Sequence, residues 1–181
     1  MPTIENALKI PGWMNPDELE WLAEQAASRK TIVEVGSWMG RSTRAMADNT
    51  EGMVFAVDTW AGSKGSDDET IHNEILKDKP EDWLLQEFLK NMQGCNNVYT
   101  YRMPSLDGAR EFKDDSFDMI FLDAGHDYDS IKADILAWGP LVAEGGLLCG
   151  HDFHSGAPGV IAAVNELLEG VKVHNSIWYV S

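Results

Sequence analysis

The chain has 181 residues, of which 44% are hydrophobic and 24% are charged. This composition is typical of a folded globular protein, and the length fits one domain. Acidic residues outnumber basic residues by 30 to 14, which gives a formal net charge of −16. Because so negative a surface repels phosphate backbones and anionic lipids, we expect no nucleic-acid partner and no membrane partner.

The sequence gives no sign of a targeting or membrane-spanning segment. No apolar run approaches the roughly 18 residues that span a bilayer, and MPTIENALKI lacks the basic and apolar regions of a signal peptide. The two cysteines, Cys95 and Cys149, have neither metal-binding spacing nor a disulfide pattern. We therefore expect a cytoplasmic protein with a single domain over residues 1–181.

Short apolar segments alternate with amphipathic ones along most of the chain. Near-continuous apolar strands are typical of a parallel sheet that is covered on both faces, so the pattern predicts an α/β fold. Strands are predicted at 31–35, 53–57, 98–102, 118–122 and 147–150, with one or two more within 171–180. Helices are predicted at 16–28, 42–48, 81–92, 105–112, 128–141 and 160–168.

One polar stretch, from Gly62 to Pro80, interrupts this alternation. An insertion after the second strand lies at the edge where open α/β sheets bind ligands. We consider two interpretations: a lid formed by residues 62–93, or an ordinary surface loop.

Acidic residues follow three of the predicted strands. Asp58 follows the second strand, Asp123 the fourth, and Asp152 lies two residues after the fifth. The carboxyl ends of parallel strands meet at one edge of the sheet, in the crevice that holds ligands. The pattern therefore favours a functional site over scattered surface charge.

The turn after the first strand contains Gly36 and Gly40, which allow a sharp bend and a close backbone approach to a ligand. The helix that begins near Ser42 offers free N–H groups to an anion. Asp58 lies 22 residues after Gly36, at the distance where an acid can bond ribose hydroxyls.

The same turn does not fit a dinucleotide. The dinucleotide fingerprint needs glycine at positions 38 and 41, which are Trp38 and Arg41 here. No Walker-type G-K-[ST] follows either. A ligand with a ribose and a carboxylate but no pyrophosphate remains, and S-adenosylmethionine has these features.

Four segments resemble the motifs of class I S-adenosylmethionine-dependent methyltransferases, closest to the small-molecule O-methyltransferases of the catechol, sugar and macrolide type. These segments are 32–43, 55–60, 117–128 and 145–153, in the family's order. The resemblance runs from about residue 12 to the end. It implies a Rossmann-like fold with a mostly parallel seven-stranded sheet flanked by helices.

The resemblance also implies which residues bind the cofactor. They are Glu34, Gly36, Ser37, Trp38, Gly40, Ser42, Asp58, Thr59, Trp60 and Ser105. In this assignment Ser42 holds the methionine carboxylate, and Glu34 fixes the turn or bonds the methionine amine. Asp58 grips the ribose, while Ser105 and Trp60 border the adenine. For Trp60, ordinary packing in the core is the alternative.

By the same resemblance, Asp123, His151 and Asp152 occupy the positions of ligands to a divalent metal such as Mg²⁺. His151 departs from the family's carboxylate or amide, and histidine suits softer metals better than Mg²⁺. His126 stands where the family has a catalytic base, and a histidine can take a proton from a hydroxyl near neutral pH. In the alternative, Asp123 only bonds the cofactor or caps the helix that begins at Tyr128, and His126 is a residue at the start of that helix with no proton to move. Asp152 and His154 would then only order their loop.

These observations favour methyl transfer to a hydroxyl oxygen of a small polar acceptor, such as a sugar or a secondary metabolite. A nicotinamide-dependent oxidoreductase and a non-catalytic module that binds S-adenosylmethionine are the alternatives. Because a lid alone leaves the site open, we also consider a homodimer in which the partner helps to close it.

Overall fold

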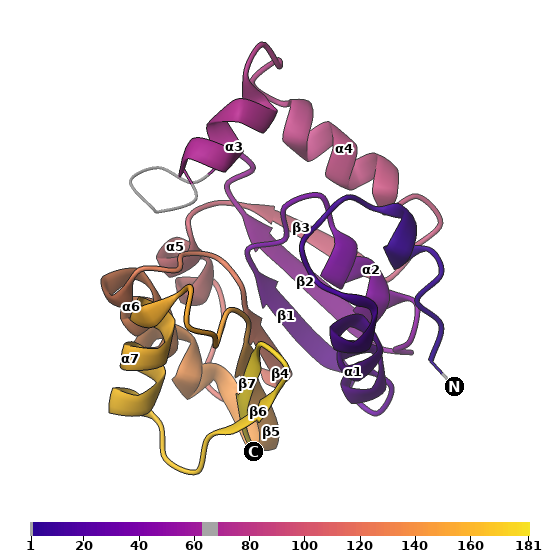
Figure 1. Ribbon diagram of the computed structural model, residues 1–181. Coiled ribbons are helices and arrows are strands. Elements are labelled where there is room, and N and C mark those ends of the chain that lie inside the picture. The colour runs from indigo at the N-terminus through magenta and orange to yellow at the C-terminus, as the bar shows by residue number, and fades with distance from the viewer. Residues whose placement is uncertain (1, 63–68) are drawn as a thin grey trace.

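A seven-stranded sheet forms the centre of the computed structural model, which describes residues 2–62 and 69–181. The strand order is β3-β2-β1-β4-β5-β7-β6, and β7 pairs antiparallel with both β5 and β6 (Figure 1). The other pairs are parallel. The strands are β1 (Thr31–Val35), β2 (Met53–Asp58), β3 (Val98–Arg102), β4 (Phe117–Leu122), β5 (Val142–Gly150), β6 (Lys172–His174) and β7 (Ile177–Val180).

Helices cover both faces of this sheet. Figure 1 shows α1 and α2 on one face and α5, α6 and α7 on the other, with α3 and α4 above the strand ends. The helices are α1 (Pro16–Ala26), α2 (Arg41–Ala47), α3 (Glu69–Leu76), α4 (Trp83–Asn91), α5 (Ser105–Arg110), α6 (Tyr128–Trp138) and α7 (Pro158–Leu167). Two short 3₁₀ helices span Ala7–Lys9 and Gly139–Leu141. No helix in the described ranges is long and apolar enough to cross a membrane.

The buried side chains form one core on each face because successive residues of a strand point to opposite faces. In β4, Met119 and Phe121 pack with α1 and α2, whereas Ile120 and Leu122 pack with α6 and α7. A third cluster lies under α4 and is centred on the fully buried Phe88. The strands are therefore held on both sides, which fixes the positions of their carboxyl ends.

The predicted fold class is confirmed: the sheet is mostly parallel, seven-stranded and flanked by helices. The strands predicted within 171–180 form as the antiparallel pair β6 and β7. The strand predicted at 147–150 begins five residues earlier, at Val142. The predicted ends of three helices were too late by two or three residues. Helix α1 stops at Ala26, α5 stops at Arg110, and α6 gives way to a 3₁₀ turn after Trp138.

The polar stretch after β2 contains a helix, α3, that the sequence analysis did not predict. Residues 63–68 of that stretch lie outside the described ranges. The helix predicted at 81–92 is confirmed as α4.

Candidate active site

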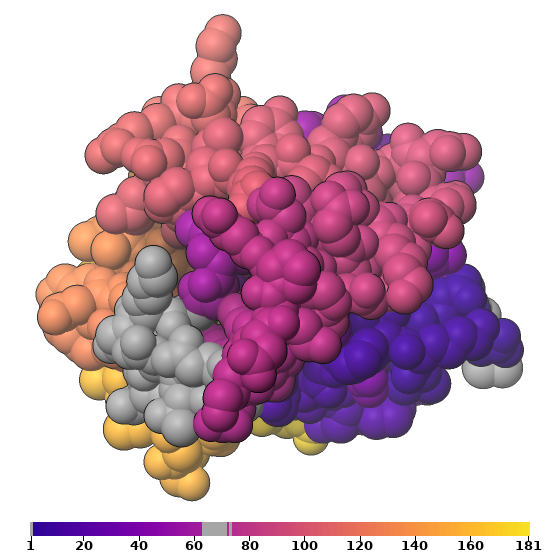
Figure 2. All heavy atoms as spheres, turned by 90° about the horizontal axis from the view of Figure 1, so that it is seen from above, coloured from indigo at the N-terminus to yellow at the C-terminus, as the bar shows by residue number. Residues whose placement is uncertain are grey.

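The carboxyl ends of the central strands border a cavity of about 620 Å³. This volume is in the range of small-molecule and cofactor sites. Figure 2 looks down on this edge of the sheet and shows residues of α3 and α4 lying across it. The predicted site residues that line the cavity are Gly36, Ser37, Trp38, Ser42, Asp58, Thr59, Ser105, Asp123, His126, His151 and Asp152.

The turn after β1 lies directly against the end of β4. The backbone N–H of Asp123 donates to the carbonyl of Val35 at 2.8 Å. Gly36 has φ of 89°, and a Cβ at this position would lie 2.1 Å from the carbonyl oxygen of Asp123. Glycine is therefore required here both for the left-handed backbone and for the close contact.

Glu34 lies beneath this turn, fully buried, and is not among the residues that line the cavity. Its carboxylate accepts hydrogen bonds from the hydroxyls of Ser42 and Thr43. Burial raises the pKa of Glu34 to about 7, although these hydrogen bonds oppose the shift. These hydrogen bonds tie the end of β1 to the first turn of α2, and they engage the Ser42 hydroxyl inside the protein. The role of Glu34 toward a cofactor stays a prediction.

Asp58, at the end of β2, also holds two turns in place. Its Oδ2 accepts from the backbone N–H groups of Ser37 and Trp38 at 2.9 and 2.8 Å. Its Oδ1 accepts from the backbone N–H of Trp60 at 2.7 Å. Burial raises the pKa of Asp58, although these backbone hydrogen bonds oppose the shift. The carboxylate also faces the cavity, where contact with a ribose stays a prediction.

Two residues that we assigned to cofactor binding lie in the core instead of the cavity wall. Trp60 is fully buried, its ring centroid is 4.8 Å from that of Phe88, and its Nε1 donates to the carbonyl of Trp38 at 2.8 Å. Gly40 starts α2 with φ of 88°, and a Cβ there would meet Met92 and Phe88. For Trp60 the structure matches the packing alternative.

A cluster of histidines and carboxylates lies at the ends of β4 and β5. Ligand atoms of Asp123, His126 and Asp152 all lie within 4.8 Å of one another. The Nε2 of His126 is 3.0 Å from Oδ2 of Asp152 and 3.9 Å from Oδ1 of Asp123. The Nδ1 of His151 is 3.2 Å from Asp152 Oδ2 and 3.7 Å from Asp123 Oδ1. The four residues that we assigned to catalysis and metal binding are thus brought together.

Electrostatic pairing dominates this cluster. Burial lowers the pKa of His126, but the carboxylates of Asp123 and Asp152 outweigh it and raise the value to about 11. Burial also lowers the pKa of His151, but the carboxylates of Asp123, Asp152 and Glu18 outweigh it and raise the value to about 10. Burial raises the pKa of Asp152, but the two histidines outweigh it and hold the pKa well below its usual range. Without another cation, the cluster consists of histidinium–carboxylate pairs.

The donor set fits a divalent cation. Carboxylate oxygens and imidazole nitrogens are common ligands of divalent transition metals. Ligand atoms of Asp123, His126 and Asp152 lie within coordination reach of one another, and Nδ1 of His151 lies 3.2 Å from Asp152 Oδ2. A cation here would replace the histidinium protons as the counter-charge of Asp123 and Asp152.

Several residues of the cavity wall were not predicted from the sequence. They include Glu18, His72, His154 and the N-terminal segment Pro11–Asn15. The rings of Trp13 and Trp38 both lie against that of His72, at centroid distances of 5.6 and 4.5 Å. His154 Nε2 lies 3.2 Å from Asp152 Oδ1. The ring contacts join distant parts of the chain, so no local motif predicts them, whereas the contact between His154 and Asp152 is local.

A mostly parallel sheet with a glycine turn after β1, acids at the ends of β2 and β4, and a cavity across these ends is the arrangement expected of a class I methyltransferase. A family model described as a methyltransferase domain matches residues 33–153. The chain belongs to this family and is an S-adenosylmethionine-dependent methyltransferase. Family membership does not support the nicotinamide-dependent alternative.

Solved structures show the same fold. A protein from Corynebacterium glutamicum is 15% identical, with a TM-score of 0.66 over 98% of this chain and 88% of that one. The O-methyltransferase NovP is 17% identical, with a TM-score of 0.60 over 90% of this chain and 78% of its own. A methyltransferase of Podospora anserina, solved with S-adenosylhomocysteine, is 12% identical, with a TM-score of 0.62 over 92% and 78%. No curated protein matches the chain in sequence.

Proposed function

We propose that this methyltransferase transfers the methyl group to a hydroxyl oxygen of a small polar acceptor, with a sugar or a secondary metabolite as the acceptor class. The observation that carries the proposal is the position of His126. Its ring lies between Asp123 and Asp152, in the same cavity as the glycine turn. His126 accepts a proton only in its neutral form, which a cation bound at Asp123 and Asp152 would favour. In that form the ring would be within reach of a hydroxyl that approaches a cofactor bound on that turn.

One group of residues binds the cofactor, and a second group activates the hydroxyl of the acceptor. The turn at Gly36 and the N-terminus of α2 bind the methionine end, and Asp58 and Ser105 bind the nucleoside end. His126 takes the proton from the acceptor hydroxyl, and the oxygen then attacks the sulfonium methyl in line. Asp123, Asp152 and His151 would hold a divalent cation, which when bound lowers the pKa of a hydroxyl attached to it.

The similar structures support the acceptor class. NovP is described as an O-methyltransferase, and CalS11, which is 13% identical with a TM-score of 0.64 over 90% of this chain, acts in calicheamicin biosynthesis as a TDP-rhamnose 3′-O-methyltransferase. Both share the fold of this chain. We therefore place nucleotide sugars first among the candidate acceptors.

The first experiment is a calorimetric titration with S-adenosylhomocysteine, with and without Mg²⁺ or Mn²⁺. We expect a dissociation constant of about 1–100 μM, equivalent to roughly −8 to −5.5 kcal/mol. No heat and no thermal shift at millimolar ligand would contradict the assigned cofactor site.

The second experiment measures S-adenosylhomocysteine release with the candidate acceptors for the wild type and for His126→Ala. We expect the variant to bind the cofactor product normally and to lose at least about 100-fold in turnover. Equal turnover in the two proteins would rule out His126 as the base. Cofactor binding without turnover on any hydroxylated acceptor would favour the non-catalytic alternative.

The homodimer stays a separate proposal. Residues 11–15 already form part of the cavity wall, so the chain supplies some of the closure that we expected from a partner. Sedimentation equilibrium that shows a strict monomer would contradict the homodimer without affecting the assigned chemistry.

A further inference from the structure

Glu18 connects the first helix to the histidine–carboxylate cluster. It occupies the third position of α1 and is 3% exposed, although it carries a charge. Its Oε1 lies 3.4 Å from Nε2 of His151, whose Nδ1 faces Asp152 and Asp123 on the opposite side of the ring. A carboxylate from the N-terminal part of the chain therefore meets the outer nitrogen of a residue at the end of β5.

The hydrogen bonds of Glu18 explain why a carboxylate is needed there. Its Oε2 accepts from the backbone N–H of Asn15 at 2.9 Å, and its Oε1 accepts from the backbone N–H of Ser176 at 3.2 Å. Both backbone partners are hydrogen-bond donors, and Nε2 of His151, 3.4 Å from Oε1, is an ion-pair partner when the ring is protonated. A glutamine at position 18 could also complete a capping box. Its amide nitrogen, however, is a donor and would face another donor.

Charge at the site agrees with this arrangement. Burial raises the pKa of Glu18, but the contact with His151 and the two backbone hydrogen bonds outweigh it and lower the pKa of this carboxyl below its ordinary value. Glu18 is thus an anion that is buried among donors. Buried charges of this kind are found where they are paired.

We propose that Glu18 is the positioning residue of His151: it holds the Nε2–H of the ring, so that Nδ1 is directed at Asp152 and Asp123. A histidine that ligates a metal commonly donates its other ring N–H to a carboxylate, which fixes the orientation of the ring. The effect of Glu18 on metal binding rests on the proposed function. The contact between Glu18 and His151 does not.

The structure offers a matched pair of variants for the test. Glu18→Gln keeps the shape of the side chain and its capping ability but places an amide among donors. Asn15→Ala removes the other half of the capping box, since the Asn15 side chain accepts from the backbone N–H of Glu18 at 3.1 Å. The second variant weakens the start of α1 and leaves the carboxylate of Glu18 next to His151.

The first measurement uses the metal-free full chain labelled with ¹⁵N-histidine. We expect the Nε2–H proton of His151, assigned from its loss in His151→Asn and distinguished from Nδ1–H by the ¹⁵N shifts of the ring, to be protected from exchange in the wild type and in Asn15→Ala. Glu18→Gln should remove this protection. A protected signal that persists in Glu18→Gln, or that Asn15→Ala removes as well, would overturn the proposal and leave Glu18 as a helix cap.

The second measurement is a calorimetric titration with Co²⁺ for the wild type, Glu18→Gln, His151→Asn and the double variant. We expect Glu18→Gln to weaken binding by about 10- to 100-fold, and to have no further effect when His151 is already replaced. Additive losses would contradict the coupling. If the wild type does not bind Co²⁺, the metal part of the proposed function fails, and the histidine signal alone decides the role of Glu18.

Discussion

At the scale of single residues, the buried carboxylate of Glu34 and the partly buried carboxylate of Asp58 hold the segments that border the cavity. Glu34 and Asp58 were assigned to the cofactor from the sequence, and each also accepts hydrogen bonds from the protein's own turns. A carboxylate that is removed from water requires such donors. These residues therefore shape the site in addition to any contact that they make with a ligand.

The contact at Gly36 leads to a prediction. Gly36→Ala places a methyl group 2.1 Å from the carbonyl oxygen of Asp123 and forces a left-handed backbone on alanine. We expect a loss of about 3 kcal/mol or more in the free energy of unfolding. Binding of S-adenosylhomocysteine should fall as well, because the turn must move away from β4. Chemical denaturation and calorimetry measure the two effects.

Gly94 provides the control, because it has the same φ of 89° and a Cβ there would have no neighbour within 4 Å. Gly94→Ala should lose only about 1 kcal/mol, the cost of the left-handed backbone. Equal losses at the two positions would mean that the contact with Asp123 adds no cost.

A second residue-scale prediction concerns Asp134, which is 4% exposed and accepts a hydrogen bond from the hydroxyl of Ser105 in the cavity wall. Burial raises the pKa of Asp134 to about 6. Between about pH 4 and pH 6 the folded state binds the proton more strongly than the unfolded state, so this contribution to stability is lost as the pH rises.

Asp134→Asn removes this titration. Relative to the wild type, the variant should therefore gain up to about 3 kcal/mol of unfolding free energy between pH 4 and pH 7.5. Urea denaturation of both proteins across this range measures the difference. A stability difference that stays constant with pH would show that Asp134 ionises normally in the folded state.

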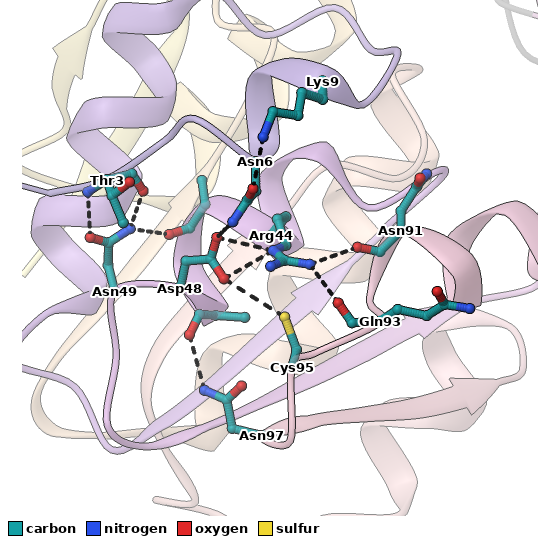
Figure 3. A network of polar contacts seen from close by, with 12 residues as sticks. Thr3, Asn6, Lys9, Arg44, Asp48, Asn49, Asn91, Gln93, Cys95 and Asn97 are labelled. Atoms are coloured by element: carbon teal, nitrogen blue, oxygen red, sulfur yellow. Dashed lines mark hydrogen bonds and ion pairs between the residues drawn. The ribbon is translucent and has the colours of Figure 1, made fainter.

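At the scale of elements, a polar network anchors α2 to the loop that precedes β3 (Figure 3). The Arg44 side chain, 14% exposed, pairs with Asp48 at 2.9 Å and donates to the carbonyls of Asn91 and Gln93 at 2.9 and 3.1 Å. Asn6 donates to the same aspartate at 2.9 Å. The network joins the N-terminal segment, α2 and the end of α4.

Arg44→Met should destabilise the protein by about 3 kcal/mol, because Asp48 and two carbonyls lose their donor. Arg44→Lys should restore less than half of this loss, since one ammonium cannot reproduce the planar set of donors. Thermal and chemical denaturation measure both variants.

Lys30, which pairs with the 90% exposed Glu51, provides the control for charge alone. Lys30→Met should cost no more than about 0.5 kcal/mol. Losses of similar size at Arg44 and Lys30 would contradict a special role for the network.

At the scale of the whole molecule, the lid interpretation depends on α3. This helix carries His72, whose ring stacks on Trp38 next to the cavity. If residues 62–93 close over a bound cofactor, S-adenosylhomocysteine should slow hydrogen exchange of the α3 amides by at least about 10-fold, because local opening becomes rarer. Mass spectrometry of the peptides from this segment measures the change.

His72→Ala tests the same idea from the protein side. It removes the ring contact with Trp38 and should reduce the ligand-dependent protection of α3 while leaving exchange in β1 and β4 unchanged. Protection of α3 that does not depend on ligand would favour a fixed wall over a lid.

The sequence by itself determined the fold class and many of the residues at the strand ends that line the cavity. Apolar periodicity, the spacing of Gly36 and Asp58, and the acids at the strand ends are local properties, because a strand, a turn and a helix start depend on a few neighbouring residues. These local properties were sufficient to predict that Asp123, His126, His151 and Asp152 lie close together, because the carboxyl ends of parallel strands meet at one edge of the sheet.

The tertiary structure alone decided which partners these residues have. Glu18 and Ser176, 158 positions apart, meet next to His151 only because α1 and the β6–β7 turn pack together around the end of β5. The burial of Trp60 depends likewise on α4 covering it. Contacts between distant segments depend on how whole elements pack, and no local pattern of residues encodes them.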